Sequence, residues 1–138
     1  MGTQQILLIV LSVIIVGIAV AVGITMFNAQ AANSNRQAVI GDMNTMAASA
    51  MAYYKTPTTH GGGAGTWTLI QVGKWVGLNF DGVDTWTTGN GTYVASVSGD
   101  VLTIVGSGTE TGNDNTNVVK ATLTLTGATS TISTSIDN

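Results

Sequence analysis

The chain changes its hydrophobic periodicity near Pro57. From Ile6 to Phe27 nearly every residue is aliphatic, and the first 35 residues contain no charged side chain. As a helix, this run of about 22 residues is about 33 Å long, enough to cross the hydrocarbon core of a bilayer. It also lacks the cationic start and the short apolar stretch of a cleaved secretory signal. We therefore predict that residues 1–27 form an apolar helix that needs lipid, or other copies of itself, around it.

The helical pattern continues beyond the apolar run. No proline interrupts residues 28–54, and one face collects apolar side chains at helical spacing, namely Val39, Met43, Met46, Ala47, Ala50 and Tyr54. Gly41 weakens such a helix by about 1 kcal/mol relative to alanine without ending it. The sequence thus predicts one helix over residues 1–54, about 80 Å long, whose amphipathic second half packs against a domain.

The remainder of the chain is Gly- and Thr-rich and alternates with a period of two. Pro57 disfavours helix in the residue before it, and the glycines after His60 favour a loop, so residues 55–65 are predicted as a linker. The clearest hairpin signal is the turn Ser98-Gly99-Asp100 between two alternating runs. The predicted strands are Trp67–Val72, Thr92–Val97, Val101–Val105, Asn117–Thr126 and Thr129–Ile136, with an irregular connection from Trp75 to Trp86. We predict an α+β fold in which residues 66–138 form a small antiparallel sheet on the second half of the helix.

Composition excludes several classes of function. Charged residues make up 8 % of the chain, against about 25 % in typical soluble domains. The four cations are scattered and the net charge is −3, so no basic surface for nucleic acid is predicted. The absence of cysteine excludes disulfides and thiolate metal sites. The many threonines suit strands that are exposed outside a cell or carry O-linked glycans.

No catalytic constellation is visible. The single histidine, His60, lies in the glycine-rich segment without a triad partner or a second metal ligand at useful spacing. Gly112–Asn117 offers oxygen ligands but one carboxylate, Asp114, which favours a turn over a calcium site. The tryptophans Trp67, Trp75 and Trp86 are expected in the head core or between subunits rather than around a ligand. We predict no enzyme activity, no metal and no cofactor. Asn90 begins a sequon and is a possible glycosylation site.

The first 54 residues resemble the type IV pilin superfamily, which comprises bacterial pilins, the pseudopilins of type II secretion and archaeal relatives. In that family a prepilin peptidase removes a short cationic leader, and the mature chain begins with an N-methylated Phe or Met. The resemblance implies that Met1 is this processed residue; cleavage after Gly2 instead would leave a leader without positive charge. It also implies a structural subunit that waits in the inner membrane and is handled by pilus assembly machinery. Such a subunit polymerises with itself into a filament on the cell surface.

Two positions depart from the bacterial pattern. Gln5 stands where most bacterial pilins have a Glu, which is thought to pair with the N-terminal amine of a neighbouring subunit. A Gln can still accept a hydrogen bond from an amine and avoids a buried unpaired charge. The proline common near position 22 is absent. The small residues in this region either loosen the helix or permit close helix packing. The expected assembly residues are Gln5, Gly17, Ala19, Ala21 and Gly23.

Two other functions remain open at this stage. One is a pseudopilin, whose short filament acts as a piston; the other is a monomeric, membrane-anchored binding domain. A simple anchor needs no amphipathic extension beyond the membrane-length run, which favours a polymerising subunit. The nearly uncharged head favours an abundant surface polymer over a pseudopilin.

Overall fold

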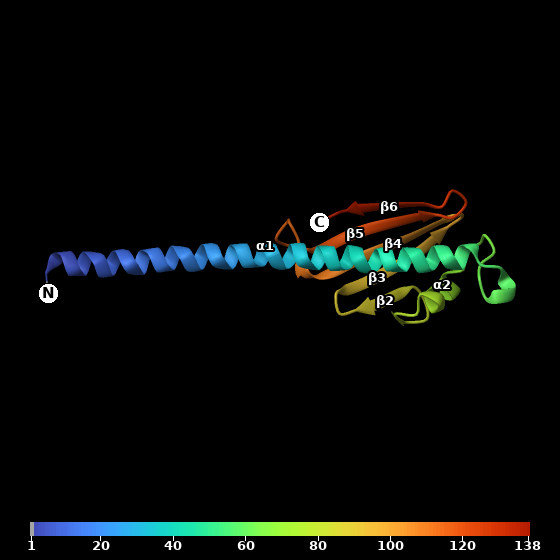
Figure 1. The fold of residues 1–138 in the computed structure, drawn as a ribbon, viewed down its shortest axis with the longest axis horizontal. Coiled ribbons are helices and arrows are strands. Elements are labelled where there is room, and N and C mark those ends of the chain that lie inside the picture. The colour runs from blue at the N-terminus through green and yellow to red at the C-terminus, as the bar shows by residue number, and fades with distance from the viewer. Residues whose placement is uncertain (1) are drawn as a thin grey trace.

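The computed structural model describes residues 2–138 and consists of one long helix with a six-stranded sheet against its second half (Figure 1). Helix α1 runs without interruption from Thr3 to Lys55, 53 residues. It ends one residue beyond the predicted end, and it keeps its helical hydrogen bonding through Gly17, Gly23 and Gly41. The prediction of a single continuous helix is confirmed for the residues that the structure describes. Met1 lies outside them.

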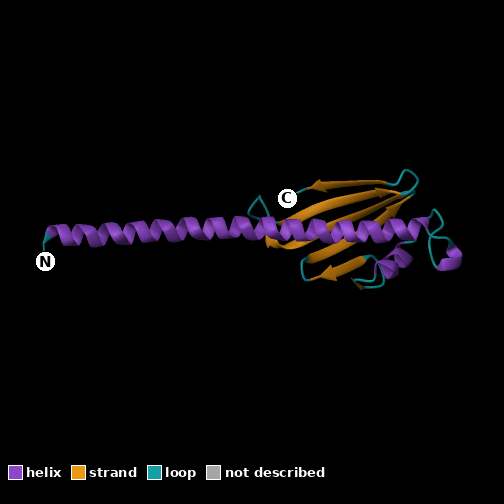
Figure 2. Cartoon of the chain, viewed as in Figure 1, coloured by secondary structure: helices purple, strands orange, loops and turns teal. Residues whose placement is uncertain are grey.

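The sheet is a meander in which each strand pairs with the next along the chain, always antiparallel (Figure 2). Its strands are β1 (Asn79–Phe80), β2 (Thr85–Thr88), β3 (Gly91–Ser98), β4 (Val101–Thr111), β5 (Val118–Thr126) and β6 (Thr131–Ile136). Helix α1 packs across β4 and β5. The predicted α+β class, with an antiparallel sheet on the second half of the helix, is confirmed.

The strongest strand predictions agree with the structure. Strands β3 and β4 form a hairpin in which Ser98 pairs with Val101, and Gly99 in the turn has a φ of 58°, in the left-handed region that favours glycine. On β5 the alternating residues Val119, Ala121, Leu123 and Leu125 are all fully buried. The period-two pattern therefore identified the buried face of this strand correctly.

The predicted strand Trp67–Val72 is wrong. Residues Leu69–Val76 form a short helix, α2, which is followed by Gly77 with a φ of 76°. Leu69, Val72 and Val76 recur at the i, i+3, i+7 spacing of an apolar helix face, and a left-handed glycine just past the last turn is a common helix stop. The connection from Trp75 to Trp86, predicted as irregular, contains the end of α2, β1 and the start of β2.

The glycine-rich segment folds back on the end of α1. The backbone N–H groups of Gly63 and Gly65 donate to the carbonyls of Tyr53 and Tyr54, both at 2.8 Å, and a 3₁₀ turn occupies Thr58–His60. These bonds satisfy carbonyls that the last turn of a helix leaves free. A Cβ at Gly63 would lie 2.7 Å from the Tyr53 ring, so glycine is required by the close approach.

The core lies between the sheet and the amphipathic half of α1. All six residues predicted for the apolar face of the helix are buried. The helix lies close to the sheet at Gly106 of β4, where a Cβ would lie 2.8 Å from the sulfur of Met43 and 3.0 Å from Val39. Trp86 and Tyr93 fill the sheet side of this core and are fully buried.

Because every buried apolar residue lies between Ala32 and Leu125, a fragment of residues 28–138 should fold by itself as a monomer. We expect a cooperative thermal transition and a β signal in circular dichroism. Size-exclusion chromatography should give the monomer mass, since the exposed apolar run is absent. A fragment without β signal would contradict the independence of the head.

Candidate assembly surface

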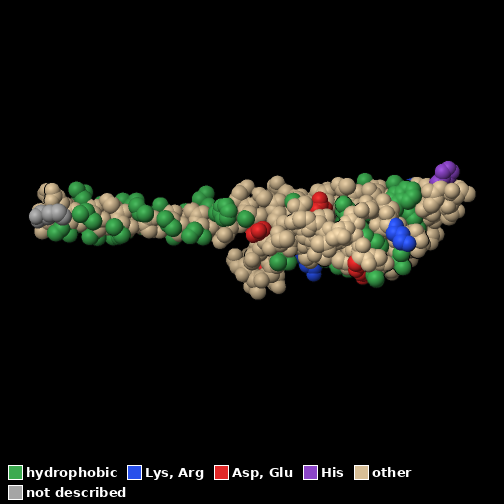
Figure 3. All heavy atoms as spheres, turned by 90° about the horizontal axis from the view of Figure 1, so that it is seen from below, with side chains coloured by type: hydrophobic (Ala, Val, Ile, Leu, Met, Phe, Trp, Pro, Cys, Tyr) green, Lys and Arg blue, Asp and Glu red, His purple; other side chains and the backbone are tan. Residues whose placement is uncertain are grey.

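No residue of α1 before Ala32 is buried, and the first half of the helix exposes its apolar side chains. Along Ile6–Phe27 the large apolar residues on every side of the helix are 50–73 % exposed, and Figure 3 shows hydrophobic side chains along the visible face of this segment. The first buried residue of α1 is Ala32. The helix is long and apolar enough to cross a membrane, which is compatible with membrane association. Water is a poor environment for this surface, because burying one Leu or Ile is worth roughly 1.5–3 kcal/mol.

The polar atoms inside this apolar run are already satisfied within the helix. The hydroxyl of Ser12 donates to the carbonyl of Leu8 at 2.7 Å, and that of Thr25 donates to the carbonyl of Ala21 at 3.1 Å. A hydroxyl bonded four residues back presents no unpaired donor to lipid or to a neighbouring helix. The segment is thus suited to either apolar environment.

The four small residues predicted for assembly form two pairs on nearly opposite faces. Gly17 and Ala21 are four residues apart and share one face, as do Ala19 and Gly23. Since each residue advances by about 100°, the two faces are about 160° apart. A Cβ at Gly17 or Gly23 would meet no atom within 4 Å. Each pair is therefore an open small-xxx-small surface of the kind that lets helix backbones approach closely.

The N-terminal candidates are placed only in part. Gln5 lies in the first turns of α1, and its exposed side chain has no hydrogen-bond partner among residues 2–138. Its predicted partner is an amine at Met1, which is outside the described residues. The roles of Gln5 and Met1 remain predictions.

One acidic residue, Asp42, joins the helix to the sheet. Its Oδ2 accepts hydrogen bonds from Tyr93 Oη at 2.7 Å, Thr88 Oγ1 at 2.9 Å and Asn90 Nδ2 at 3.0 Å. Burial raises the pKa of Asp42, but the three hydrogen bonds outweigh this and hold the pKa below its usual value. Burial, together with the bond to Asp42, raises the pKa of Tyr93. We call these four side chains the Asp42 clamp.

Asn90, the possible glycosylation site, is part of this clamp. The nitrogen that would carry a glycan donates to Asp42, and the backbone carbonyl of Asn90 accepts a bond from Asn35 Nδ2 at 2.9 Å. Asn35 Oδ1 also accepts the backbone N–H of Thr109 at 3.0 Å, beside the irregularity in the β4–β5 pairing. The sequon therefore lies in a half-buried joint between α1 and the sheet.

A second joint lies at the far end of the head. Asp100, in the β3–β4 turn, accepts the Tyr54 hydroxyl at 2.6 Å through Oδ1 and the N–H of Ala128 at 2.8 Å through Oδ2. Its carbonyl accepts the indole N–H of Trp67 at 2.9 Å. The bond from Tyr54, with that from Ala128, lowers the pKa of Asp100, and the same contact raises the pKa of Tyr54. We call this set the Asp100 clamp.

Both clamps should make the head sensitive to acid. Because the pKa values of Asp42 and Asp100 are lower in the folded state than in the unfolded state, their stabilisation is present above the usual value of 3.8 and is lost as the pH falls toward the folded values. We expect the melting temperature of the 28–138 fragment to be level from pH 7 to about pH 5 and to drop below that. The double variant Asp42→Asn/Asp100→Asn should lose less stability in acid than the parent, and the loss that remains should come from Asp81 and Asp114, whose pKa values are also lowered by hydrogen bonds. An equally steep loss in that variant would contradict the assignment.

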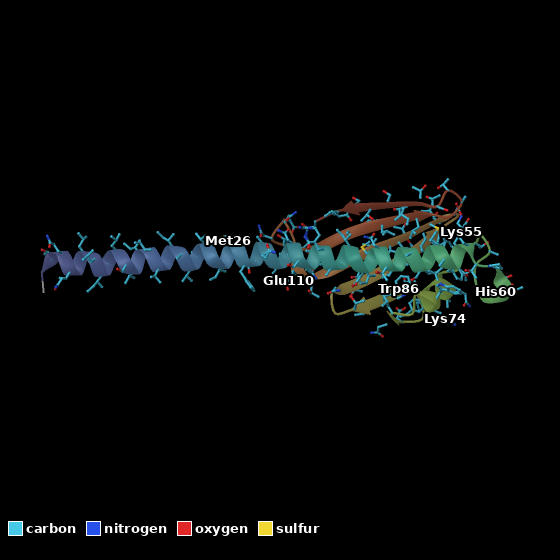
Figure 4. All side chains as sticks on the ribbon, viewed as in Figure 1. Met26, Lys55, His60, Lys74, Trp86 and Glu110 are labelled. Atoms are coloured by element: carbon cyan, nitrogen blue, oxygen red, sulfur yellow. The ribbon has the colours of Figure 1, made fainter. Side chains whose placement is uncertain are left out.

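The remaining candidates lie apart from this surface. His60 is exposed at the opposite end of the molecule (Figure 4), and its ring contacts Thr59. The Asp114 carboxylate accepts the N–H groups of Thr116 and Asn117, which confirms the turn and lowers its pKa. No group of three His, Cys, Asp or Glu that could hold a metal occurs within residues 2–138.

The tryptophans differ in burial. Trp67 and Trp86 are buried in the head, whereas Trp75 is 39 % exposed beside Tyr53. The expectation of core positions is therefore confirmed for two of the three.

Sequence reasoning missed the two clamps. A signal for one of them existed, because Asp42 is the single acidic residue in all of α1 and lies beside the apolar face. A lone carboxylate at such a position needs donors from the packed domain.

Comparison with known protein families, with characterised proteins and with solved structures found no match for this chain.

Proposed function

We propose that this protein is a structural subunit that polymerises through the bare half of α1 into a type IV pilus-like surface filament. The observation that carries the proposal is the division of one continuous helix into two parts. The second half is buried under the sheet, while the first half exposes an apolar surface all round. Such a rod requires apolar surroundings on every side, which a membrane provides for a monomer and a helix bundle provides for a polymer.

The arrangement of small residues supports a polymer over a pair. A helix with one close-packing face forms a dimer, whereas α1 presents Gly17 and Ala21 on one face and Ala19 and Gly23 on the other. If one face packs against the opposite face of the next copy, the contact is heterologous. A contact of this kind generates an open helical filament when its rotation does not close into a ring.

Movement from lipid into a bundle gains little from hydrophobicity, because lipid tails are as apolar as the helix. Close backbone packing at the small residues therefore has to supply the specificity. The hydroxyl-rich head, which carries few charged residues, then faces outward. In this proposal the partners are other copies of the chain, a prepilin peptidase and the assembly machinery. The subunit resides in the inner membrane before it is assembled.

Electron microscopy of material sheared from producing cells tests the proposal, together with mass spectrometry of the subunit's N-terminus. We expect long filaments built from this chain, with a methylated Met1. Low abundance with co-purification of a secretion system would favour a pseudopilin. A protein that remains monomeric in the membrane would favour an anchored binding domain.

Gln5 gives a sharper test of subunit contact. If the amine of Met1 enters the filament core, Gln5 of a neighbour is its expected acceptor, and an unpaired charge there is costly. Gln5→Leu should slow assembly in a filament-growth assay. Gln5→Glu should assemble at least as fast as the parent, since a charge-assisted bond is stronger. A Gln5→Leu variant that assembles at the parent rate would remove this role.

A further inference from the structure

A groove lies at the base of the head, between α1 and the loop that connects β4 to β5. Its walls include Thr25, Asn28 and Asn33 from the helix, Glu110 from the end of β4, and Asn113 and Asn115 from the loop, and its volume is about 680 Å³. Figure 4 shows Met26 on the bare helix and Glu110 on the adjoining edge of the head. The groove is thus located where the apolar rod leaves the domain.

Its position along the helix matches the surface of a bilayer. The helix wall extends from Thr25 to Asn33, about 12 Å of rise, and begins within the last turn of the apolar run that ends at Phe27. When that run fills the hydrocarbon core, about 30 Å thick, the layer outside it is the headgroup region, about 5–8 Å thick on each side. The groove then opens into the lipid headgroups.

The chemistry of the lining suits a zwitterion. Glu110 supplies its only ionised group, and this exposed carboxylate has no hydrogen-bond or ion-pair partner among residues 2–138. The amides of Asn28, Asn113 and Asn115 supply N–H donors. The guanidinium of Arg36 does not line the groove. Its Nη1 donates to Asn33 Oδ1 at 2.7 Å, and its Nη2 is buried.

We propose that this groove holds the headgroup of a phosphatidylethanolamine-type lipid and so seats the head on the membrane. The primary ammonium donates to the Glu110 carboxylate, and the phosphate oxygens accept from the asparagine amides. A choline headgroup has no N–H donor for the carboxylate, and an anionic headgroup without an ammonium meets Glu110 as a like charge. The proposal depends on membrane insertion of the apolar run and not on polymerisation.

Native mass spectrometry of the full chain in mild detergent tests lipid selection. With equal amounts of phosphatidylethanolamine, phosphatidylcholine and phosphatidylglycerol added, we expect about a tenfold preference for phosphatidylethanolamine, the size of one charge-assisted hydrogen bond. Glu110→Gln should abolish the preference. Asp84→Asn, which removes the same charge from the distant β1–β2 connection, should retain it. Equal retention of the three lipids, or an unchanged preference in Glu110→Gln, would overturn the proposal.

The depth of the groove can be measured separately, because the chain contains no cysteine. A fluorophore on Thr116→Cys, which is exposed in the same loop but does not line the groove, should be quenched by nitroxide at the headgroup of phosphatidylethanolamine vesicles, whereas one on Thr59→Cys, at the opposite end, should not. Equal quenching of the two labels would overturn the proposal. So would cross-links showing that a second copy of α1 fills the groove in the membrane.

Discussion

Replacing Gly17 by leucine is expected to leave the protein in the membrane while reducing filament yield by about tenfold or more. A Cβ at this position meets nothing within 4 Å in the isolated chain, so the substitution should not disturb the fold or the membrane insertion of the monomer. In a bundle the added side chain overpacks a helix contact, which costs about 1–3 kcal/mol, and each 1.4 kcal/mol is about a factor of ten. Sheared filament yield, normalised to membrane-bound subunit, measures the effect.

The matched control is Val20→Leu, which adds apolar volume at a position that is already branched and 55 % exposed. Its yield should remain close to the parent value. Gly23→Leu, on the opposite face, should reduce filaments as Gly17→Leu does. If the contact joins opposite faces, a mixture of the two leucine variants should form pairs without filaments. Parent yield from Gly17→Leu would refute the packing account.

The second large effect concerns the joint between helix and sheet. Asp42→Ala should lower the stability of the head by about 3 kcal/mol, because Tyr93, Thr88 and Asn90 each lose an acceptor in a half-buried position. Urea unfolding of the 28–138 fragment, followed by circular dichroism, measures the change.

Asp42→Asn provides the control, because its amide oxygen keeps one acceptor while the charge is removed. We expect it to lose less than half of what Asp42→Ala loses. Equal stability of the alanine variant and the parent would mean that the clamp contributes nothing to the fold.

The long helix could be predicted because two independent signals agree over it. Hydrophobic content identified the apolar half, and helical spacing of Val39, Met43 and Ala50 identified the packed half. Both are local properties of the chain, and no glycine within α1 meets a neighbour that would compete with helix. The same holds for β5, where strict alternation leaves one choice of buried face.

The structure of the α2 region could not be predicted in this way, because the segment is too short for hydrophobic periodicity to distinguish a helix from a strand. Within the ten residues from Trp67 to Val76, Trp67 and Leu69 fit a strand while Leu69, Val72 and Val76 fit a helix. Tertiary contact decides between them: Gly73 is packed so closely on the Phe80 ring that no side chain fits there. That contact is formed by the turn into β1, which the sequence does not reveal.

The clamps were missed for a related reason. Asp42 lies 46–51 residues from its three donors, and nothing local ties them together. A single carboxylate on an otherwise acid-free helix indicates that donors must exist, but their identity depends on the register of β2 and β3. Candidate sites that lie along the helix were therefore accessible from the sequence, whereas those formed between helix and sheet were not.

The two clamps also have a mechanical consequence. They hold α1 at Asp42, near the middle of its packed half, and at Tyr54, near its end, 12 residues apart or about 18 Å along the axis. A pull on the helix along its axis loads both clamps and the core between them in shear, so that they must break together rather than one after another. The joint is therefore strongest along the axis of the helix and weaker against a force that peels the sheet away from one end.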